Sequence, residues 1–442
     1  MGPRKLSAFD ATLLVVGGIV GVGIFYNPSR IAAAVPDPGW YLALWVFGAL
    51  VAVHAALVFA ELGAAYPQAG GWYVFLRAAF GPFPAFLFAF VVLGVVATGA
   101  SAVMMEICVA NLAGIVPGVG PPGTAAGQVA GAVILVLVTA LALAGVKAGA
   151  LLQNGCTLIK LAAIAALALG AWIVFEPGSV QPTPPPPPPE GGLGAGALRA
   201  LLPIFFAYGG WQMVCYVAPE VRDPSRTLPR AILLGVAIVA AAYLAINAGY
   251  LRVLGLGGLA ADPAFAGEFA RRTLGPTGGE ILRAAMGVSA LGVCVVTILT
   301  SPWLFVAMAR EGLFFERFGR LHPRTGAPVA ALCVQLTLAL GYWLWGGAGF
   351  LVDNVVFVEW IFHGLVAAAF LRLRRLPGAS WPFRSRFGTW AAWVYLLTAT
   401  AVVAGNLQGD AVWIGGVVLA LGAIVYRPWR ALVARRAVGS AS

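Results

Sequence analysis

Two glycine-rich interruptions occur within apolar stretches of the chain: Gly17-Gly18-Ile19-Val20-Gly21-Val22-Gly23-Ile24-Phe25 and Phe206-Ala207-Tyr208-Gly209-Gly210-Trp211. Glycine leaves helical geometry readily, and each unpaired backbone group inside a bilayer costs several kcal/mol. Unwound backbone persists there only where protein, water or a bound solute completes its hydrogen bonds. Freed amides bind carboxylates and freed carbonyls bind ammonium groups, so the paired breaks predict the solute site of a transporter.

Lys160 is a second candidate for chemistry because its charge lies deep in an apolar stretch. It falls about ten residues from either end of the predicted fifth span, about 15 Å deep at 1.5 Å per residue. Such a charge is costly and usually functional. It fits either a permanently charged strut in an obligatory exchanger or a group that titrates and couples transport to protons. The structural alternative is packing against a carboxylate. Glu106 in the third span is the candidate for that partner, and also for a proton carrier in its own right.

The composition identifies the elements that must position these residues. Hydrophobic residues make up 61% of 442 positions and charged residues 10%, which predicts an all-α polytopic membrane protein. About twelve stretches reach the roughly 20 apolar residues that cross a hydrocarbon core. They begin near positions 9, 40, 83, 127, 150, 199, 229, 280, 328, 348, 389 and 410. The first span is itself the expected targeting element, because no secretory cleavage pattern precedes it.

Membrane topology, rather than nucleic-acid binding, accounts for the net charge of +11. With alternating spans, most Lys and Arg residues fall on one side, which is therefore expected to be cytoplasmic together with both termini. The arginines on the other side are Arg30, Arg199, Arg252, Arg271, Arg272 and Arg283. Anionic lipid headgroups are a secondary partner. Charged residues at the cytoplasmic helix ends could form an inner gate or be simply solvated: Glu61, Arg77, Glu220, Arg222, Asp223, Arg226, Arg310 and Glu311.

The remaining polar features carry no pattern of catalytic or metal-binding residues. Pro182 to Pro189, with seven prolines in eight residues, predicts a stiff external spacer, and residues 253–278 predict a short interfacial helix. The five cysteines match neither a disulfide framework nor a metal site. Other polar residues lie in or near spans without catalytic spacing: His54, Asp353, Glu359 and His363. We expect no enzyme activity, no cofactor and no metal.

Six motifs along the chain resemble those of the amino acid–polyamine–organocation (APC) transporters, and within them the L-type amino acid exchangers and their bacterial relatives. They are Gly21-Val22-Gly23-Ile24-Phe25, the run from Glu61 to Tyr73, Gly145-Val146-Lys147 with Lys160-Leu161, Phe206 to Trp211, Asp223 to Pro229, and Ala309 to Phe314. Their order and sides match the family. The resemblance implies a LeuT-like inverted repeat of five plus five helices, with helices 1 and 6 discontinuous and two extra C-terminal helices.

This fold divides the single membrane domain of residues 1–442 into five parts. Residues 1–175 would form the first inverted repeat and 199–372 the second. An external Pro-rich loop of 176–198 would join them. Two additional helices over 389–426 and a cytoplasmic tail over 427–442 would complete the chain.

The resemblance also implies which backbone groups bind substrate. The amides around Gly21, Val22 and Gly23 would receive the carboxylate of an amino acid. Its ammonium would be received by the carbonyls of Ile19, Phe206, Ala207 and Gly209. The family usually has Ser where this chain has Val22, so carboxylate binding here would depend on backbone amides alone. Amides at a half-helix start are adequate for that purpose.

Side chains near the breaks have roles implied by the same resemblance. Phe206 and Trp211 flank the second break and would act as gates that exclude water, with ordinary aromatic packing as the alternative. Ser101, Met104 and Met105 in the third span would line the side-chain pocket, although Met at helical spacing also suits a core.

Lys160 matches a lysine that sodium-independent family members place between spans one and eight, where sodium-coupled relatives bind a cation. It would be a tethered substitute for that cation, so sodium is not the expected coupling ion. The eukaryotic exchangers attach a heavy subunit through a cysteine in the loop after the third span, and Pro117 to Gly123 here has none. We therefore expect no disulfide-linked heavy subunit, and the Ala, Gly and Arg richness suits a bacterial inner membrane.

Together these observations predict a multi-pass transporter of neutral L-amino acids that works by alternating access, sodium-independently, and by exchange. The alternatives left open are a proton-coupled amino acid symporter and a cationic amino acid or polyamine antiporter. A substrate sensor without a transport cycle is the alternative from a different class, and it would be expected to carry an added signalling domain.

Overall fold

The computed structural model consists of helices and connecting loops over the residues that it describes, which are 5–176, 183–184, 186–187, 191–346, 348–377, 380–405, 407 and 410–439. The side chains of residues 348–357, 410–411 and 434–439 lie outside this description. Half of the predicted Pro-rich spacer, residues 182, 185, 188 and 189, falls outside the described residues, as does the end of the predicted tail at 440–442.

The first half of the chain supplies these helices: α1 (Ala8–Ile19), α2 (Gly23–Ala33), α3 (Pro38–Ala65), α4 (Trp72–Phe80), α5 (Pro82–Val91), the π-helical segment η1 (Val92–Val96), α6 (Ala97–Leu112), α7 (Ala125–Leu143) and α8 (Val146–Ile173). The second half supplies α9 (Gly192–Tyr208), α10 (Met213–Tyr216), η2 (Ala218–Glu220), α11 (Pro224–Ala261), α12 (Phe265–Leu274), α13 (Gly278–Thr300), α14 (Pro302–Arg310), η3 (Glu316–Gly319), α15 (Val329–Trp345), α16 (Ala348–Leu373), α17 (Gly388–Gly405) and α18 (Asp410–Gly439).

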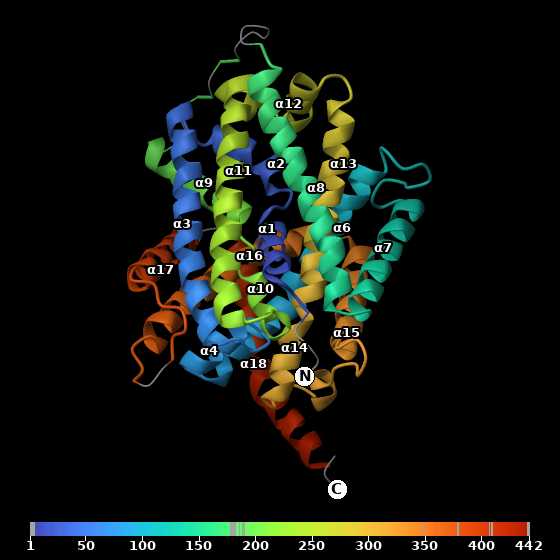
Figure 1. Cartoon of the computed structure of the whole chain (residues 1–442), viewed down its shortest axis with the longest axis vertical. Coiled ribbons are helices and arrows are strands. Elements are labelled where there is room, and N and C mark those ends of the chain that lie inside the picture. Colours follow the sequence, from blue (N-terminus) through green and yellow to red (C-terminus); the bar gives the residue numbers. More distant parts are fainter. Residues whose placement is uncertain are drawn as a thin grey trace.

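The broken helix α1–α2 lies inside a ring of longer helices (Figure 1). The half-helix α1 packs against α8, α11 and α13, whereas α2 packs against α9 and α11. The longest helix, α11, also packs along α3, and α13 packs along α6. The scaffold helices therefore surround the first break on several sides and can hold its backbone in place.

Eight described helices or continuous helix pairs are long and apolar enough to cross a membrane. A ninth candidate is the pair α1 and α2, which pass the same test together and are bent by 42° at their break. Two shorter apolar helices, α9 and α15, lie at predicted spans six and nine. The chain is thus a multi-pass helical protein, whereas the count of twelve spans stays a prediction.

Local sequence explains where the first helices begin. Ser7 caps α1 by accepting from the Asp10 amide, and the Asp10 carboxylate accepts from the Ser7 amide in return. Asp37 caps α3 in the same way by accepting from two amides, and Pro38 occupies the first helical position, where no amide donor is needed. These caps fix both ends of the segment that contains the first break.

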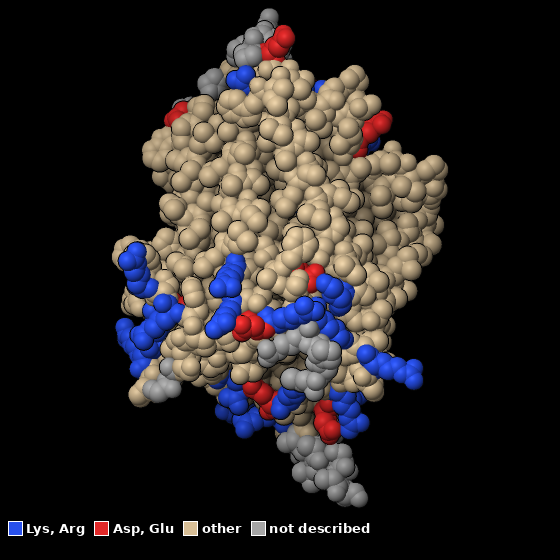
Figure 2. Space-filling view, in the orientation of Figure 1, with Lys and Arg blue, Asp and Glu red and all other residues tan. Residues whose placement is uncertain are grey.

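Basic side chains gather at one end of the molecule, the end where both termini lie (Figures 1 and 2). The middle of the visible face carries almost no charge. Such a distribution is expected of a protein whose middle contacts lipid and whose Lys- and Arg-rich loops face one aqueous side. We call this end the arginine-rich end below.

Ion pairs join helices at the arginine-rich end, as the sequence suggested for some of these residues. The Arg77 Nε of α4 donates to Glu311 Oε2, just after α14, at 2.9 Å, and the Tyr73 hydroxyl donates to the same carboxylate at 3.2 Å. In a second ion pair, Arg374 Nη1 lies 3.5 Å from Glu61 Oε1. These contacts link α4 to the residue after α14, and α3 to the residue after α16.

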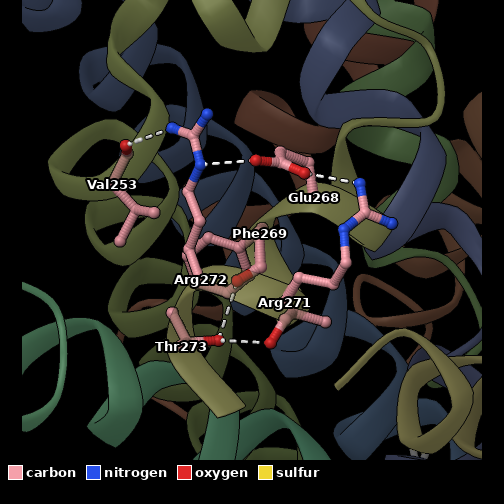
Figure 3. A network of polar contacts seen from close by, with 7 residues as sticks. Val253, Glu268, Phe269, Arg271, Arg272 and Thr273 are labelled. Atoms are coloured by element: carbon pink, nitrogen blue, oxygen red, sulfur yellow. Dashed lines mark hydrogen bonds and ion pairs between the residues drawn. The ribbon is translucent and has the colours of Figure 1, made fainter. Parts of the chain in front are cut away.

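The short helix α12 confirms that a helix forms within residues 253–278, whereas its place at the membrane interface stays a prediction. Its Glu268 accepts from both Arg271 and Arg272, and Arg272 also donates to the Val253 carbonyl of α11 (Figure 3). The hydrogen bond from Arg272 and, after it, the one from Arg271 hold the pKa of Glu268 below its usual range. At a pH above the ordinary glutamate pKa of about 4.3, the network therefore stabilises α12. This stabilisation is lost as the pH falls through the lowered pKa of Glu268.

Candidate functional site

At the first break, backbone carbonyl groups lose their helical hydrogen bonds and accept hydrogen bonds from other residues instead. Helix α1 ends at Ile19, and Val20 has a non-helical ψ of 87°. The Ile19 carbonyl accepts from the Gly21 amide at 2.8 Å and from the Tyr243 hydroxyl of α11 at 3.2 Å. The Ile19 carbonyl and the Gly21 amide, both predicted to bind substrate, are therefore hydrogen-bonded to each other. A substrate that binds the Gly21 amide must replace this hydrogen bond.

The ammonium group of Lys160 donates hydrogen bonds to two more carbonyls at this break. The side chain is fully buried on α8, and its Nζ donates to Gly17 O at 2.9 Å and to Val20 O at 2.6 Å. Gly292 of α13 is adjacent, because a Cβ there would lie 3.2 Å from Nζ. The charge of Lys160 thus lies between α1 and α13, which are the first and eighth predicted spans.

Glycine at position 17 makes this arrangement sterically possible. A Cβ at Gly17 would lie 1.9 Å from the Gln153 side chain and 2.3 Å from the Thr157 hydroxyl, both on α8. A larger residue would require the Gln153 and Thr157 side chains to move, so glycine permits this close approach of α1 to α8. The close approach brings the Gly17 carbonyl within reach of Lys160.

Glu106 and Lys160, the two predicted coupling residues, do not meet. Glu106 is exposed on α6 and lines a cavity of about 310 Å³ with residues of α15 and with Gln128 of α7. No ion pair involves Lys160 among the residues that the structure describes. Lys160 therefore does not pack against the Glu106 carboxylate, because the partners of its ammonium are backbone carbonyls.

The second break lies directly against the first. Helix α9 ends at Tyr208, and the chain turns through Gly209 and Gly210 before α10. Gly210 has a φ of 123°, and a Cβ there would lie 2.3 Å from the Gly18 carbonyl oxygen. The backbone of one break therefore contacts the backbone of the other at Gly18 and Gly210.

Opposite helix ends meet where the breaks adjoin. A Cβ at Gly23, the first residue of α2, would lie 3.4 Å from the Cα of Ala207, close to the end of α9. The N-terminus of α2 has no side-chain cap. Its first amides carry the positive end of the helix dipole, and the last carbonyls of α9 carry the negative end. This arrangement can bind a carboxylate and an ammonium side by side.

Two tyrosines of α11 support the broken helix, and the sequence analysis did not identify them. The Tyr243 hydroxyl donates to Ile19 O, and the Tyr250 hydroxyl donates to Ile24 O at 3.3 Å. They lie seven residues apart, which is about two helical turns and therefore one face of α11. This spacing was the available signal. A further contact, from Asn27 Nδ2 of α2 to Pro203 O of α9 at 2.9 Å, joins the two broken helices.

The predicted gate residues differ in exposure. Phe206 is 47% exposed, and one of its ring carbons would lie 3.6 Å from a Cβ at Gly23. Trp211 is 2% exposed and faces His363 of α16, with 6.1 Å between the ring centroids. Phe206 therefore lies beside the start of α2, whereas Trp211 is enclosed on the other side of the second break.

The predicted pocket residues of α6 are buried behind α13. Ser101, Met104 and Met105 are all at most 8% exposed. The Ser101 hydroxyl donates to Ala97 within its own helix, and the Ser101 carbonyl accepts from Cys294 of α13 at 3.8 Å. The neighbour of that cysteine, Val293, is the side chain that a Cβ at Gly21 would contact at 3.4 Å. The three residues thus adjoin the helix that faces the first break.

A buried polar cluster near the start of α1 was also not identified from the sequence. Asp10 is 1% exposed, and its carboxylate accepts from Lys147 at 2.6 Å and from Asn154 at 2.8 Å, both on α8. These partners lie 137 and 144 residues away in the sequence. The cluster fixes the start of α1 to the helix that carries Lys160. Among the described residues, no group of His, Cys, Asp and Glu is arranged to hold a metal ion.

Comparisons with known proteins identify the family to which the chain belongs. A family model described as amino acid permease matches residues 6–424. The chain is 29% identical to the serine/threonine exchanger SteT of Bacillus subtilis (strain 168) over 383 residues, which cover 84% of each protein. It is also 29% identical to the human b(0,+)-type amino acid transporter 1 over 374 residues, 84% of this chain and 76% of that protein. Identity to the human large neutral amino acids transporter small subunit 2 is 28% over 383 residues, 84% of this chain and 70% of that protein.

Proposed function

The chain belongs to the amino acid permease family of the APC superfamily, and on that premise we propose that it exchanges neutral L-amino acids across the plasma membrane without sodium. Membership makes it a multi-pass transporter of amino acids and not an enzyme. The observation that carries the proposal is the contact between the start of α2 at Gly23 and the end of α9 at Ala207. An amino acid has the two charges that these helix ends attract.

In this proposal, the amides at Val22 and Gly23 bind the substrate carboxylate first. Gly21 joins them when its bond to the Ile19 carbonyl opens. The carbonyls of Phe206, Ala207, Gly209 and Ile19 bind the substrate ammonium. Val22 supplies no hydroxyl, so affinity for the carboxylate depends on the helix dipole and on the backbone amides. Phe206 closes over the bound amino acid, and Trp211 forms the other side of the gate.

Neutral substrates are favoured by the side chains around the breaks. A Cβ at Gly18, Gly21 or Gly23 would lie 3.7, 3.4 and 3.6 Å from the apolar side chains of Met213, Val293 and Phe206 respectively. The polar side chain beside Gly23, that of Asn27, is uncharged. Glu106, which could attract a cationic side chain, lines a different cavity. A charged substrate side chain would lose its hydration against this apolar surface without a partner. We infer that Ser101, Met104 and Met105 shape the remaining wall of the pocket.

Independence from sodium is inferred from the position of Lys160. Its ammonium already donates to Gly17 O and Val20 O, the kind of carbonyl group that would otherwise coordinate a sodium ion. A cation fixed in this way enters no transport stoichiometry. Exchange then follows if the broken helices move between the outward-open and inward-open conformations only with an amino acid bound. The serine/threonine exchanger among the relatives supports this mode.

We further infer the orientation and assembly of the chain. The arginine-rich end, with both termini, faces the cytoplasm, and residues 1–175 and 199–372 form two inverted repeats of a twelve-span, LeuT-like protein. The similarity to a Bacillus subtilis protein fits a bacterial plasma membrane. Because the loop from Pro117 to Gly123 has no cysteine, the chain works without a disulfide-linked heavy subunit.

Vesicle transport tests this function. Purified protein in proteoliposomes is expected to take up radiolabelled neutral L-amino acids only when the vesicles are preloaded with unlabelled substrate. Replacement of sodium by choline should leave the rate unchanged, because Lys160 holds the cation position. Uptake into empty vesicles driven by an inward proton gradient would contradict exchange, and preferential uptake of arginine or putrescine would contradict the neutral substrate class.

A further inference from the structure

A second cavity lies away from the two breaks, between α5, η1, α14, α15 and α18. Its volume is about 230 Å³, and its lining includes Phe86, Phe90, Leu93, Met308 and Leu338. Leu338 of α15 is 38% exposed, so the cavity reaches the protein surface on an apolar helix. The volume is roughly eight times the space of one water molecule in the liquid.

The cavity suits hydrocarbon rather than water or an amino acid. Its lining residues are apolar, and the indole N–H of Trp429 already donates to Leu313 O at 3.0 Å. The Gly94 carbonyl likewise accepts from the Tyr342 hydroxyl at 2.8 Å. A polar solute there would leave its own hydrogen-bonding groups unpaired.

The π-helical segment η1 helps to create this space. A π-helical turn contains an extra residue and locally widens the helix, and such segments occur frequently at functional sites. Gly94 is at the centre of η1 and lines the cavity, and a Cβ there would have no neighbour within 4 Å. The glycine therefore leaves open a volume that a larger side chain would fill without disturbing the backbone.

Exposed arginines lie close in sequence to residues that line the cavity, at the arginine-rich end. Arg310 ends α14 two residues after the lining residue Met308, and Arg427 and Arg430 lie beside Trp429 on α18. No ion pair involves these three arginines within the described part of the chain. The nearby carboxylate Glu311 is already paired with Arg77, and Glu316 is paired with Arg320. Positive charge without an ion pair among the described residues thus lies within a few residues of the cavity lining in the sequence.

We propose that this cavity binds one acyl chain of an anionic phospholipid from the leaflet at the arginine-rich end. The chain lies against η1 and Met308, and the phosphate group binds Arg310, Arg427 and Arg430. Charge complementarity selects the anionic headgroup, because basic residues at a membrane surface attract such lipids. The site is independent of the amino acid site, so its test does not depend on substrate specificity.

Photolabelling in nanodiscs tests the proposal. The probes are phosphatidylglycerol and phosphatidylcholine, each with a diazirine in the acyl chain, and labelled peptides are identified by mass spectrometry. Phosphatidylglycerol is expected to label residues 86–94 and 425–429. Gly94→Leu should abolish this labelling. Its matched control is Gly155→Leu on α8, which is also helical with no neighbour within 4 Å of a Cβ and should label normally.

The arginines provide a second, independent arm. Arg427→Gln combined with Arg430→Gln should lower phosphatidylglycerol labelling by about fivefold per arginine and leave phosphatidylcholine labelling unchanged. The control pair Arg375→Gln and Arg386→Gln removes two exposed arginines at the end of α16 and before α17, outside the cavity lining. Equal labelling of Gly94→Leu and Gly155→Leu would overturn the site, and equal labelling by both lipids would overturn the anionic headgroup.

Discussion

Replacing Lys160 with methionine is expected to lower the rate of amino acid exchange by at least about 100-fold. The substitution removes two charged hydrogen bonds, to Gly17 O and Val20 O, each worth about 1.5–3 kcal/mol. It leaves two carbonyls of the first break without this donor inside the protein. The geometry of the α1 end and of the adjoining α2 amides would then no longer be fixed. Exchange in preloaded proteoliposomes, normalised to the amount of folded protein, measures the effect.

Two further variants separate the charge of Lys160 from its packing. Lys160→Arg keeps a buried cation that can donate to the same carbonyls, so it should retain more activity than Lys160→Met. Lys160→Ala leaves the carbonyls and space for a small cation, so sodium chloride should stimulate its exchange relative to choline chloride. Wild-type rates in Lys160→Met, or no difference among the three variants in either salt, would contradict the tethered-cation role.

A methyl group at Gly210 is expected to abolish exchange almost completely. Gly210→Ala would place a Cβ 2.3 Å from the Gly18 carbonyl oxygen and 2.8 Å from the Ile19 amide nitrogen. Both are backbone atoms, so the two breaks must move apart, and the φ of 123° adds strain for any residue other than glycine. Displacement of binding groups by about 1 Å can cost about 100-fold in rate, so we expect at least that loss. Initial exchange rates at saturating substrate are the measurement.

Gly209→Ala is the matched control for Gly210→Ala. Gly209 has a φ of −67° and a ψ of 154°, a conformation that alanine adopts readily. Its Cβ would contact only the Phe205 and Phe206 carbonyl oxygens, at 3.5 and 3.6 Å. The Gly209 carbonyl stays in place, so exchange should remain close to the wild-type rate. Equal loss in both variants would indicate that the glycines matter for helix flexibility rather than for contact between the breaks.

The positions of both breaks were predictable because glycine and apolar length are properties of the sequence itself. The burial of Lys160 was predictable from its place near the middle of an apolar stretch. The short helix at Phe265–Leu274 was predictable from a segment that mixes charged residues with glycines. Each of these features depends on residues that are neighbours in the chain.

The partners of Lys160 were not predictable, because backbone carbonyls occur at every residue and leave no signal in the sequence. Glu106 was the natural candidate for a partner by residue type, yet it faces another cavity. The contacts of Asp10 with Lys147 and Asn154 join segments more than 130 residues apart, and only packing brings them together. The π-helical turn at η1 likewise has no established sequence signature.

The measurement that tests the account most directly is equilibrium binding of an amino acid and its blocked analogues to the purified protein. L-serine, its methyl ester and N-acetyl-L-serine would be compared by isothermal titration calorimetry. If the α2 amides bind the carboxylate and the α9 carbonyls bind the ammonium, each analogue should bind at least about tenfold more weakly than L-serine, because each loses charged hydrogen bonds. Equal binding of L-serine and either analogue would contradict recognition by the paired breaks.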